Sequence, residues 1–382
     1  MTEGDPKPET DSKPEATLAA RLAGVEAGTP LAEALATRAE ATRNTEASYR
    51  VLFETADTDR LSAAERFAIA LAAAEVHEDR VLIDFYRARL DEAGGDPSVD
   101  ARHEAAVRHV KRVAAEPVRI AAADLRNLEA AGWSADAILT LSQIVAYVSF
   151  QSRLVAGLAL LAGTAEAPRI APKTIMAGPW HTQPKTAGGK PAPTAFTRDE
   201  LGWEPWLPPR DRATLSAEET ARLAKAGHLQ SDYFMLLARD LPVLDHRTRT
   251  DKGIFYTHGG LPRPERELAA TVTSKVNGCI YCASVHARKA AQLSGEPAPI
   301  DALLAVQPGA DLAAGQPPRW AAEARFAAQL AATPSAVTAD HLAPLRALDL
   351  TELDLLDLVG SVAFFSWANR LMLTLGEPFR QR

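Results

Sequence analysis

The sequence contains little cysteine and no dense cluster of basic residues, and both shortages limit what the protein can be. Only two cysteines occur in 382 residues, so a framework of disulfides is excluded. In a reducing cytoplasm, a close pair of cysteines more often serves catalysis or binds a metal. The net charge is −7 and no dense Lys/Arg cluster occurs, which argues against a nucleic-acid partner.

Signals for export and for a membrane span are also missing. Residues 1–16, MTEGDPKPETDSKPEA, are charged and rich in proline, and they lack the apolar segment of a secretory signal; we expect a disordered tail. The longest apolar stretch, 144–163, is broken by Gln151, Ser152 and Arg153, which a lipid-facing helix rarely carries at its centre. We therefore expect a cytoplasmic protein without a membrane partner.

Apolar residues at helical spacing are abundant. They make up 47% of the chain, which suffices for the cores of two domains at this length. The Ala- and Leu-rich blocks show apolar positions three and four residues apart and no convincing alternation, so the sequence predicts an all-α fold. Residues 164–212 are rich in Pro, Gly, Lys and Thr and read as a linker. The predicted domains are therefore residues 17–163 and 213–382.

The two halves share sequence features in the same order. LSAAERFAIALAAAEV, from Leu61, aligns with LPRPERELAATVTSKV, from Leu261, at an offset of 200. AYVSFQSRLVAGLALLAG, from Ala146, aligns with AFFSWANRLMLTLGEP, from Ala363. Chance similarity between alanine-rich helices could explain one such pair, but two pairs in the same order favour a tandem repeat.

Residues 277–286 read NGCIYCASVH and hold both cysteines. The Asn-Gly pair should end one helix, which places the cysteines at the start of the next. Cys279, Cys282 and His286 then share one helix face, so both sulfurs and the imidazole can meet. Free amides at a helix N-terminus and a nearby imidazolium stabilise a thiolate, which attacks peroxides and disulfides. The spacing favours a reactive pair that can close a disulfide.

Three other interpretations of the pair stay open. A structural zinc site needs about four ligands, and without a second Cys-x-x-Cys it would require a distant residue such as His258. Two inert cysteines are possible because free cysteine often packs as a small apolar residue. A thioredoxin-like site would need a βαβ context, which the sequence lacks.

The run ERELAATVTSKVNGCIYCASVHARKAAQL resembles the alkylhydroperoxidase D-like branch of the carboxymuconolactone decarboxylase superfamily. The signature there is a Glu twelve residues before Cys-x-x-Cys-x-x-x-His, which is Glu267 in this sequence. The phrases FTRDELGWEPWLPP and SDYFMLLARD resemble the segment preceding the signature in peroxidase-related members, so the resemblance covers residues 196–382. The N-terminal half is similar to a divergent domain of the same superfamily.

The resemblance implies reduction of a hydroperoxide. Glu267 would act through His286 to take the proton from Cys282, whose thiolate attacks the terminal oxygen and becomes a sulfenic acid; Cys279 then closes the disulfide. The reverse assignment of the two cysteines stays open, as does a simple helix-dipole role for Glu267. A dithiol or lipoyl-type donor would recycle the disulfide, and we expect no metal or other cofactor.

Two neighbours of the cysteines are candidate supporting residues. Some relatives carry a histidine between the cysteines, where this chain has Tyr281, which can donate a hydrogen bond but is a poor base near neutral pH. Asn277 is a candidate donor, although Asn before Gly more often serves turn formation.

The N-terminal half cannot carry out this chemistry. At the offset of 200, the signature positions are occupied by Phe67, Asp79, Leu82 and Tyr86. The polar cluster at 77–79 is more typical of a solvated helix cap than of a metal site. We expect a pseudo-active domain, an internal pseudo-dimer, and a homo-oligomer built from such pseudo-dimers.

Three functional alternatives follow from these features. The first is the lactone decarboxylase or isomerase chemistry found elsewhere in the superfamily, which needs no cysteine pair. The second is a thiol-disulfide carrier that exchanges electrons with a partner protein without consuming peroxide. The third concerns the N-terminal half alone, which would act as an assembly module.

Overall fold

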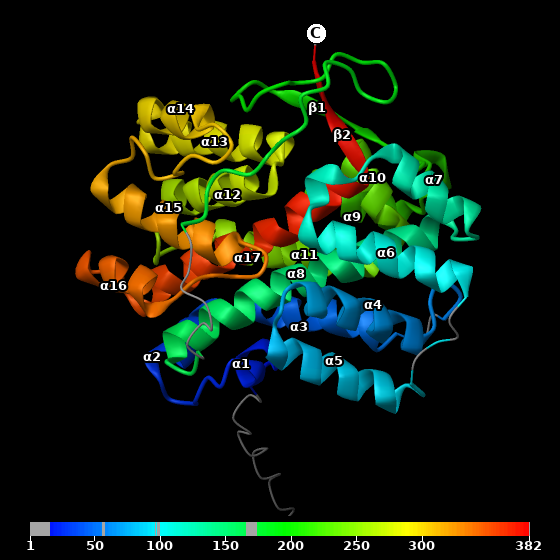
Figure 1. Ribbon diagram of the computed structural model, residues 1–382, viewed down its shortest axis with the longest axis horizontal. Helices are drawn as coiled ribbons and strands as arrows, with labels where there is room; N and C mark the ends of the chain where they lie inside the picture. The colour runs from blue at the N-terminus through cyan, green and yellow to red at the C-terminus, as the bar shows by residue number, and fades with distance from the viewer. Residues whose placement is uncertain (1–15, 56–57, 96, 98–99, 166–173, 382) are drawn as a thin grey trace, which may run out of the picture.

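The computed structural model describes residues 16–55, 58–95, 97, 100–165 and 174–381, and Figure 1 shows it as a bundle of helices. Helices form most of the described chain, and a two-stranded sheet lies at one edge, which confirms the all-α prediction. The predicted tail lies outside the described residues except for Ala16, and so does the segment 166–173 of the predicted linker.

The N-terminal half contains α1 (Leu18–Leu22), α2 (Pro30–Thr37), α3 (Ala39–Phe53), α4 (Ala63–Val76), α5 (Arg80–Glu92), α6 (Ala101–Ala115), η1 (Pro117–Arg119), α7 (Ala122–Ala130) and α8 (Ala135–Ala162). The remaining elements are β1 (Leu201–Pro205), η2 (Arg212–Thr214), α9 (Ala217–Ala226), α10 (Asp232–Leu237), η3 (Ala238–Asp240), α11 (Leu241–Phe255), α12 (Arg263–Asn277), α13 (Ile280–Ser294), α14 (Pro297–Ala305), α15 (Pro318–Ala331), α16 (Ala339–Ala347), α17 (Glu352–Thr374) and β2 (Gly376–Arg380). The order of helices after α3 resembles the order after α11.

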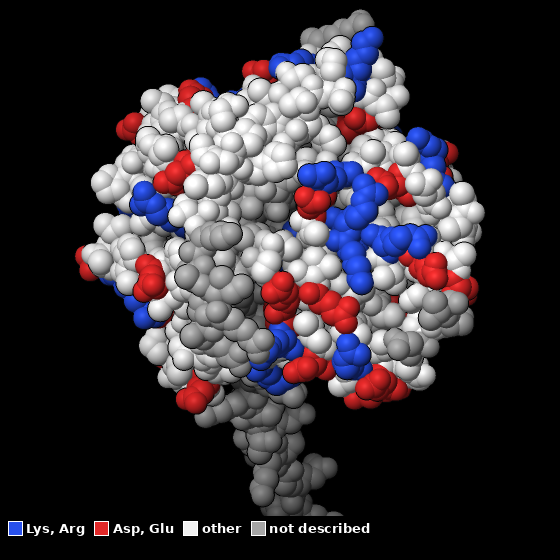
Figure 2. Space-filling view, viewed as in Figure 1, with Lys and Arg blue, Asp and Glu red and all other residues white. Residues whose placement is uncertain are grey.

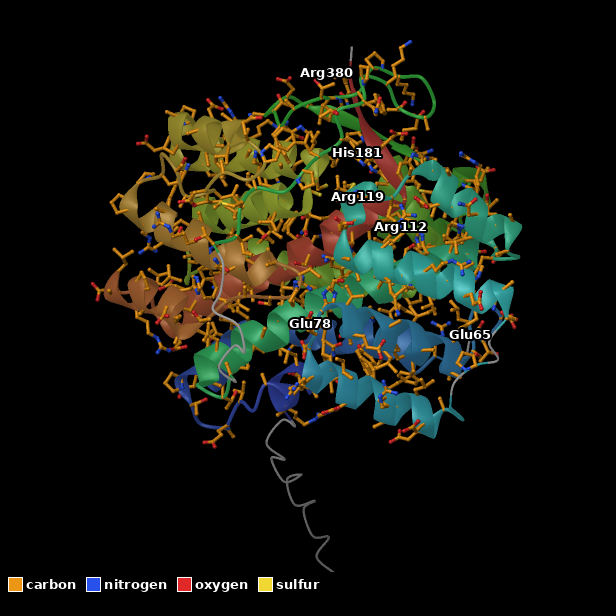
Figure 3. The ribbon with its side chains drawn as sticks, viewed as in Figure 1. Glu65, Glu78, Arg112, Arg119, His181 and Arg380 are labelled. Atoms are coloured by element: carbon orange, nitrogen blue, oxygen red, sulfur yellow. The ribbon has the colours of Figure 1, made fainter. Side chains whose placement is uncertain are left out.

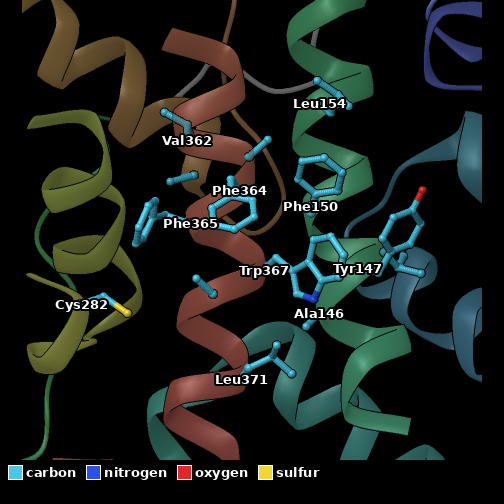
Figure 4. Close-up of a cluster of buried hydrophobic side chains, with 14 of the residues drawn as sticks. Ala146, Tyr147, Phe150, Leu154, Cys282, Val362, Phe364, Phe365, Trp367 and Leu371 are labelled. Atoms are coloured by element: carbon cyan, nitrogen blue, oxygen red, sulfur yellow. The ribbon is translucent and has the colours of Figure 1, made fainter. Parts of the chain in front are cut away.

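The long helices α8 and α17 pack against each other at the centre of the molecule. Trp367 of α17 lies 5.3 Å from the ring of Tyr147 and 5.5 Å from that of Phe150, both on α8 (Figure 4). Gly157 allows the close approach, because a Cβ atom there would lie 2.4 Å from Val359 Cγ1. The two halves therefore share one apolar core.

Helix α8 has the length and hydropathy of a membrane-spanning helix, yet 89% of its apolar window is buried inside the protein. Gln151, Ser152 and Arg153, which interrupt the apolar stretch, are buried within the fold as well. This burial assigns α8 to the core of the bundle.

The turn between α4 and α5 repeats the turn between α12 and α13. Helices α5 and α13 each begin shortly after a residue with positive φ. These residues are Glu78 at +52° (labelled in Figure 3) and Gly278 at +79°. A Cβ atom at Gly278 would lie 2.2 Å from the carbonyl oxygen of Pro179, so only glycine fits there. The same backbone path thus occurs 200 residues apart.

Two buried arginines, one in each half of the chain, each donate hydrogen bonds to the other half. Arg153 of α8 donates to the carbonyl of Ala332 at 2.5 Å, at the end of α15. Arg370 of α17 donates to the carbonyl of Ala114 at 2.7 Å, at the end of α6. Both also contact Thr333 Oγ1. Each half therefore supplies hydrogen-bond donors to helix-end carbonyls of the other.

Much of the predicted linker is in contact with the C-terminal half. Strand β1 pairs antiparallel with β2, and Trp203 donates to the carbonyl of Met372 at 3.1 Å. The buried ammonium of Lys275 lies 4.9 Å from the ring of Trp180 and 4.1 Å from that of Phe196. The division into two domains stays a prediction, with this segment packed on the second.

One face of the molecule carries a basic group to the right of centre in Figure 2, where Figure 3 labels Arg112 and Arg119. Arg112 is paired with Asp124, and Arg119 lies 3.1 Å from Glu116. Acidic partners thus offset these cations.

Candidate functional site

Helices α12 and α13 place the signature residues. Helix α12 ends at Asn277, Gly278 turns the chain, and α13 runs from Ile280 to Ser294 with Cys279 at its N-cap position. These boundaries confirm the helix stop and the helix start that the sequence predicts around the cysteines. Because Glu267 is on α12, which packs against α13, the turn brings its carboxylate to His286.

The buried carboxylate of Glu267 is held by two groups. Its Oε2 atom is hydrogen-bonded to Nδ1 of His286, and its Oε1 atom accepts from Nε of Arg263 at 2.6 Å. Burial acts to raise the pKa of Glu267, but His286 and Arg263 outweigh it, so the pKa lies below its ordinary value. Glu267 is therefore an anion that accepts the Nδ1 proton of His286. This arrangement leaves Nε2 of His286 for proton transfer.

The two thiols are free and differ in their surroundings. Cys282 lines a cavity of about 330 Å³ together with His286, whereas Cys279 does not. Burial, followed by the neighbouring Cys282, raises the pKa of Cys279 well above its usual range. Cys282 is thus the thiol that faces the cavity, and Cys279 is a protonated thiol that does not line it.

Aromatic side chains from α11 and α17 form the apolar part of the cavity wall. The ring of Phe365 lies 4.2 Å from that of His286, and Phe255 lies 5.9 Å from it. Figure 4 shows Phe365 on the side of α17 that faces Cys282. These rings place apolar surface against the imidazole, and a less polar surrounding strengthens its hydrogen bond with the Glu267 carboxylate.

Sequence reasoning missed several polar residues of the cavity. Tyr233 of α10 and Arg247 and Asp251 of α11 line it, and none of the three was singled out. Burial raises the pKa of Asp251. The only signal was the spacing of four between Arg247 and Asp251, which places them on one face of a helix.

Of the two candidate supporting residues, Tyr281 lies at the cavity and Asn277 contacts α17 instead. Tyr281 lines the cavity, and burial together with the two cysteines raises its pKa to about 12, so it is a hydrogen-bond donor near neutral pH. Asn277 instead donates to Asn369 Oδ1 at 3.0 Å and links α12 to α17.

The zinc alternative lacks a ligand set in the part of the chain that the structure describes. No group of three His, Cys, Asp or Glu side chains gathers there in a way that could hold a metal ion. His258 has an exposed side chain and is not among the residues that line the cavity beside Cys282.

Aromatic rings occupy the corresponding region of the N-terminal half. Phe67 stacks on Phe53 at 5.4 Å, and Tyr86 lies 5.5 Å from the same ring. Tyr86 donates to Gln151 at 2.5 Å. Asp79, in the position of Cys279, accepts from the amide of Leu82 as a helix cap. The second copy of the backbone path therefore carries packing in place of thiol chemistry.

Comparison with known families gives one match. Residues 242–328 match the family described as the carboxymuconolactone decarboxylase family, a range that includes Glu267, both cysteines and His286. The match confirms the superfamily that the sequence signature indicates. No curated protein matches the chain at a significant level.

Proposed function

We propose that this protein, whose residues 242–328 match the carboxymuconolactone decarboxylase family, reduces organic hydroperoxides with the thiols of Cys282 and Cys279. The observation that carries the proposal is the connection from the buried Glu267 carboxylate through His286 to the cavity lined by Cys282. Family membership alone is equally compatible with non-redox chemistry. The histidine–carboxylate pair beside a cysteine favours an activated thiol.

The first step is activation of Cys282. His286 lies one helical turn after Cys282 on α13, so its Nε2 atom is the base that takes the thiol proton. The anionic Glu267 stabilises the imidazolium that results, as a buried carboxylate does in other histidine-activated nucleophiles.

The next step transfers one oxygen atom. The thiolate of Cys282 attacks the terminal oxygen of the hydroperoxide, the O–O bond breaks, and an S–O bond forms. The leaving alkoxide takes the proton from His286 and departs as the alcohol. Cys282 is then a sulfenic acid, oxidised by two electrons, and the peroxide has been reduced by two.

Cys279 resolves the sulfenic acid. Its raised pKa keeps it a thiol while Cys282 reacts. Its sulfur then attacks the sulfur of Cys282, an S–S bond forms, and the hydroxyl group leaves as water with the Cys279 proton. The closed disulfide protects Cys282 from further oxidation.

A dithiol of the lipoyl type is the proposed reductant, because disulfide exchange through a mixed disulfide returns two electrons at once. A cytoplasmic location suits such a cycle, since the compartment keeps dithiols reduced. We further propose that the pseudo-dimers assemble as homo-oligomers.

The experiment is a thiol count with intact mass on the reduced protein before and after one equivalent of cumene hydroperoxide. The proposal expects rapid loss of both thiols with loss of two hydrogens in mass, and slower loss in Cys282→Ser and Glu267→Gln. Glu323→Gln is the matched control, because Glu323 is a buried glutamate of α15 that does not line the cavity.

Other outcomes identify the alternatives. Thiols that survive peroxide would contradict the proposal and direct attention to decarboxylase or isomerase chemistry. Exchange with dihydrolipoamide without consumption of peroxide would indicate a thiol-disulfide carrier.

A further inference from the structure

Arg247 is a buried cation that forms no ion pair with the residues that the structure describes. It is 5% exposed and lines the cavity beside Cys282. Its guanidinium makes no hydrogen bond or ion pair with any residue that the structure describes, and its Nε is buried without a partner. Its contacts are aromatic faces, with Cζ 4.9 Å from the Phe364 ring. Burial of an unpaired charge is costly, so a ligand that supplies the counter-charge would be strongly favoured.

Tyr233 provides a second unused donor in the same wall. It is 3% exposed, lines the cavity, and its hydroxyl has no partner among the described residues. Its ring lies 5.8 Å from Arg247 Cζ. Burial raises the pKa of Tyr233, so the hydroxyl keeps its proton and can donate. A guanidinium and a hydroxyl in the wall of one cavity are suited to an acceptor with two oxygens.

The other charged groups of the wall leave Arg247 available. Arg263 is bound to Glu267, and Lys289 contacts the hydroxyl of Tyr256 at 3.2 Å. Lys252 is exposed. Asp251 is the acidic residue of the wall; the charge of Arg247 acts to lower the pKa of Asp251, but burial outweighs it and raises that pKa. The wall as a whole is therefore cationic.

A large part of the remaining cavity surface is apolar. Phe255, Phe364, Phe365 and Met372 contribute to it, and its volume of about 330 Å³ is at the small end of ligand cavities. A fitting ligand has a compact apolar body and one anionic end. One guanidinium and one hydroxyl suit a carboxylate better than a phosphate dianion, which would require more donors.

We propose that the substrate is a small hydroperoxide that carries a carboxylate, and that Arg247 with Tyr233 binds this carboxylate and orients the peroxide toward Cys282. The inference rests on the proposed function and adds the substrate class to it. Arg247 is then a specificity-determining residue.

The test compares 4-carboxycumene hydroperoxide with its methyl ester. The wild-type kcat/KM for the acid should exceed that for the ester by roughly tenfold to a hundredfold, as expected for a charged hydrogen bond. In Arg247→Met this ratio should fall to about one, and in Tyr233→Phe it should fall by a few-fold. Arg249→Met is the control, because Arg249 is an exposed residue of the same helix.

Binding of the unreactive 4-isopropylbenzoate, measured by calorimetry, separates the two proposals. If peroxide is not consumed but Arg247→Met loses this binding, the carboxylate site stands and the peroxidase function fails. If both hydroperoxides are reduced equally by the wild type, the function stands and the inference is overturned. Tighter binding of inorganic phosphate than of the benzoate would also overturn it. Tyr233→Phe, which removes one hydroxyl, decides the matter if Arg247→Met does not fold.

Discussion

The Nδ1 atom of His286 is hydrogen-bonded to the buried carboxylate of Glu267, and the same carboxylate is hydrogen-bonded to Arg263. The pair joins two helices, α12 and α13, across the turn at Gly278. The imidazole is thereby fixed in one tautomer, with its other nitrogen left for chemistry.

Glu267→Gln should slow oxidation of the thiols. The amide cannot stabilise an imidazolium as the carboxylate does, so kcat/KM for cumene hydroperoxide should fall by about a hundredfold. Stopped-flow measurement of thiol loss checks the rate, and thermal melts check the fold. A rate within a few-fold of the wild type would show that Glu267 has only a structural role.

Glu323 should make stability depend on pH. Its carboxyl is 1% exposed, and burial, followed by Glu265, raises its pKa to about 9, while Arg319 is hydrogen-bonded to Glu265. Arg319 Nε is also 3.2 Å from Glu323 Oε1, but that geometry makes no hydrogen bond. Burial outweighs the opposing attraction of Arg319. Between the ordinary value of 4.5 and about 9, the folded state then binds more protons than the unfolded state, so stability falls as pH rises.

Glu323→Gln removes this effect, because an amide does not titrate. The variant should gain roughly 1–3 kcal/mol over the wild type at pH 7, and the gain should disappear toward pH 4. Urea unfolding at several pH values measures it. A gain that is constant with pH would contradict the raised pKa.

Gly278→Ala should destabilise the protein and disturb the thiols. The backbone has φ +79°, and the new Cβ atom would meet the carbonyl oxygen of Pro179 at 2.2 Å. We expect the free energy of unfolding to fall by about 2–4 kcal/mol.

Gly295→Ala is the matched control for Gly278→Ala. Gly295 has φ +73°, and a Cβ atom added there would have open space around it. The free energy of unfolding of Gly295→Ala should therefore fall by only about 1 kcal/mol. Equal losses in the two variants would mean that the contact with Pro179 contributes nothing.

Arg153→Met should weaken the contact between the halves. It leaves the carbonyl of Ala332 without this buried donor and the hydroxyl of Thr333 with Arg370 alone, which costs about 2–4 kcal/mol. Arg119→Met, at a side chain that is 65% exposed, should change stability by less than about 0.5 kcal/mol. Chemical unfolding followed by circular dichroism compares them, and an unchanged Arg153 variant would show that the crossing hydrogen bonds are dispensable.

Local signals explain why the signature could be placed from the sequence. An Asn-Gly and a Ser-Gly pair mark the ends of α12 and α13, and the spacing within α13 fixes which of its side chains share a face. These features depend on a few adjacent residues.

The cavity wall could not be predicted in the same way. Arg247 and Tyr233 lie on helices that tertiary packing brings to Cys282, and an arginine in a helix is usually solvated. The partner of Asn277 is Asn369, which is more than 90 residues away, so the sequence suggested a donor or a turn former but not this contact. Long-range contacts, which no short sequence pattern encodes, determine both the lining of the cavity and the partner of Asn277.

The crossing arginines bear on why a half without thiols persists in the chain. Loss of residues before the linker would remove Arg153 from the carbonyl at the end of α15 and expose the face of α17 that packs on α8. A substitution that disturbs α8 therefore also acts, through folding, on the half that holds the cysteines. Phe67 and Tyr86, at the positions that correspond to Glu267 and His286, are constrained by ring packing, and α8 is constrained by its contact with α17. The same contacts predict that the two halves melt together in a single calorimetric transition.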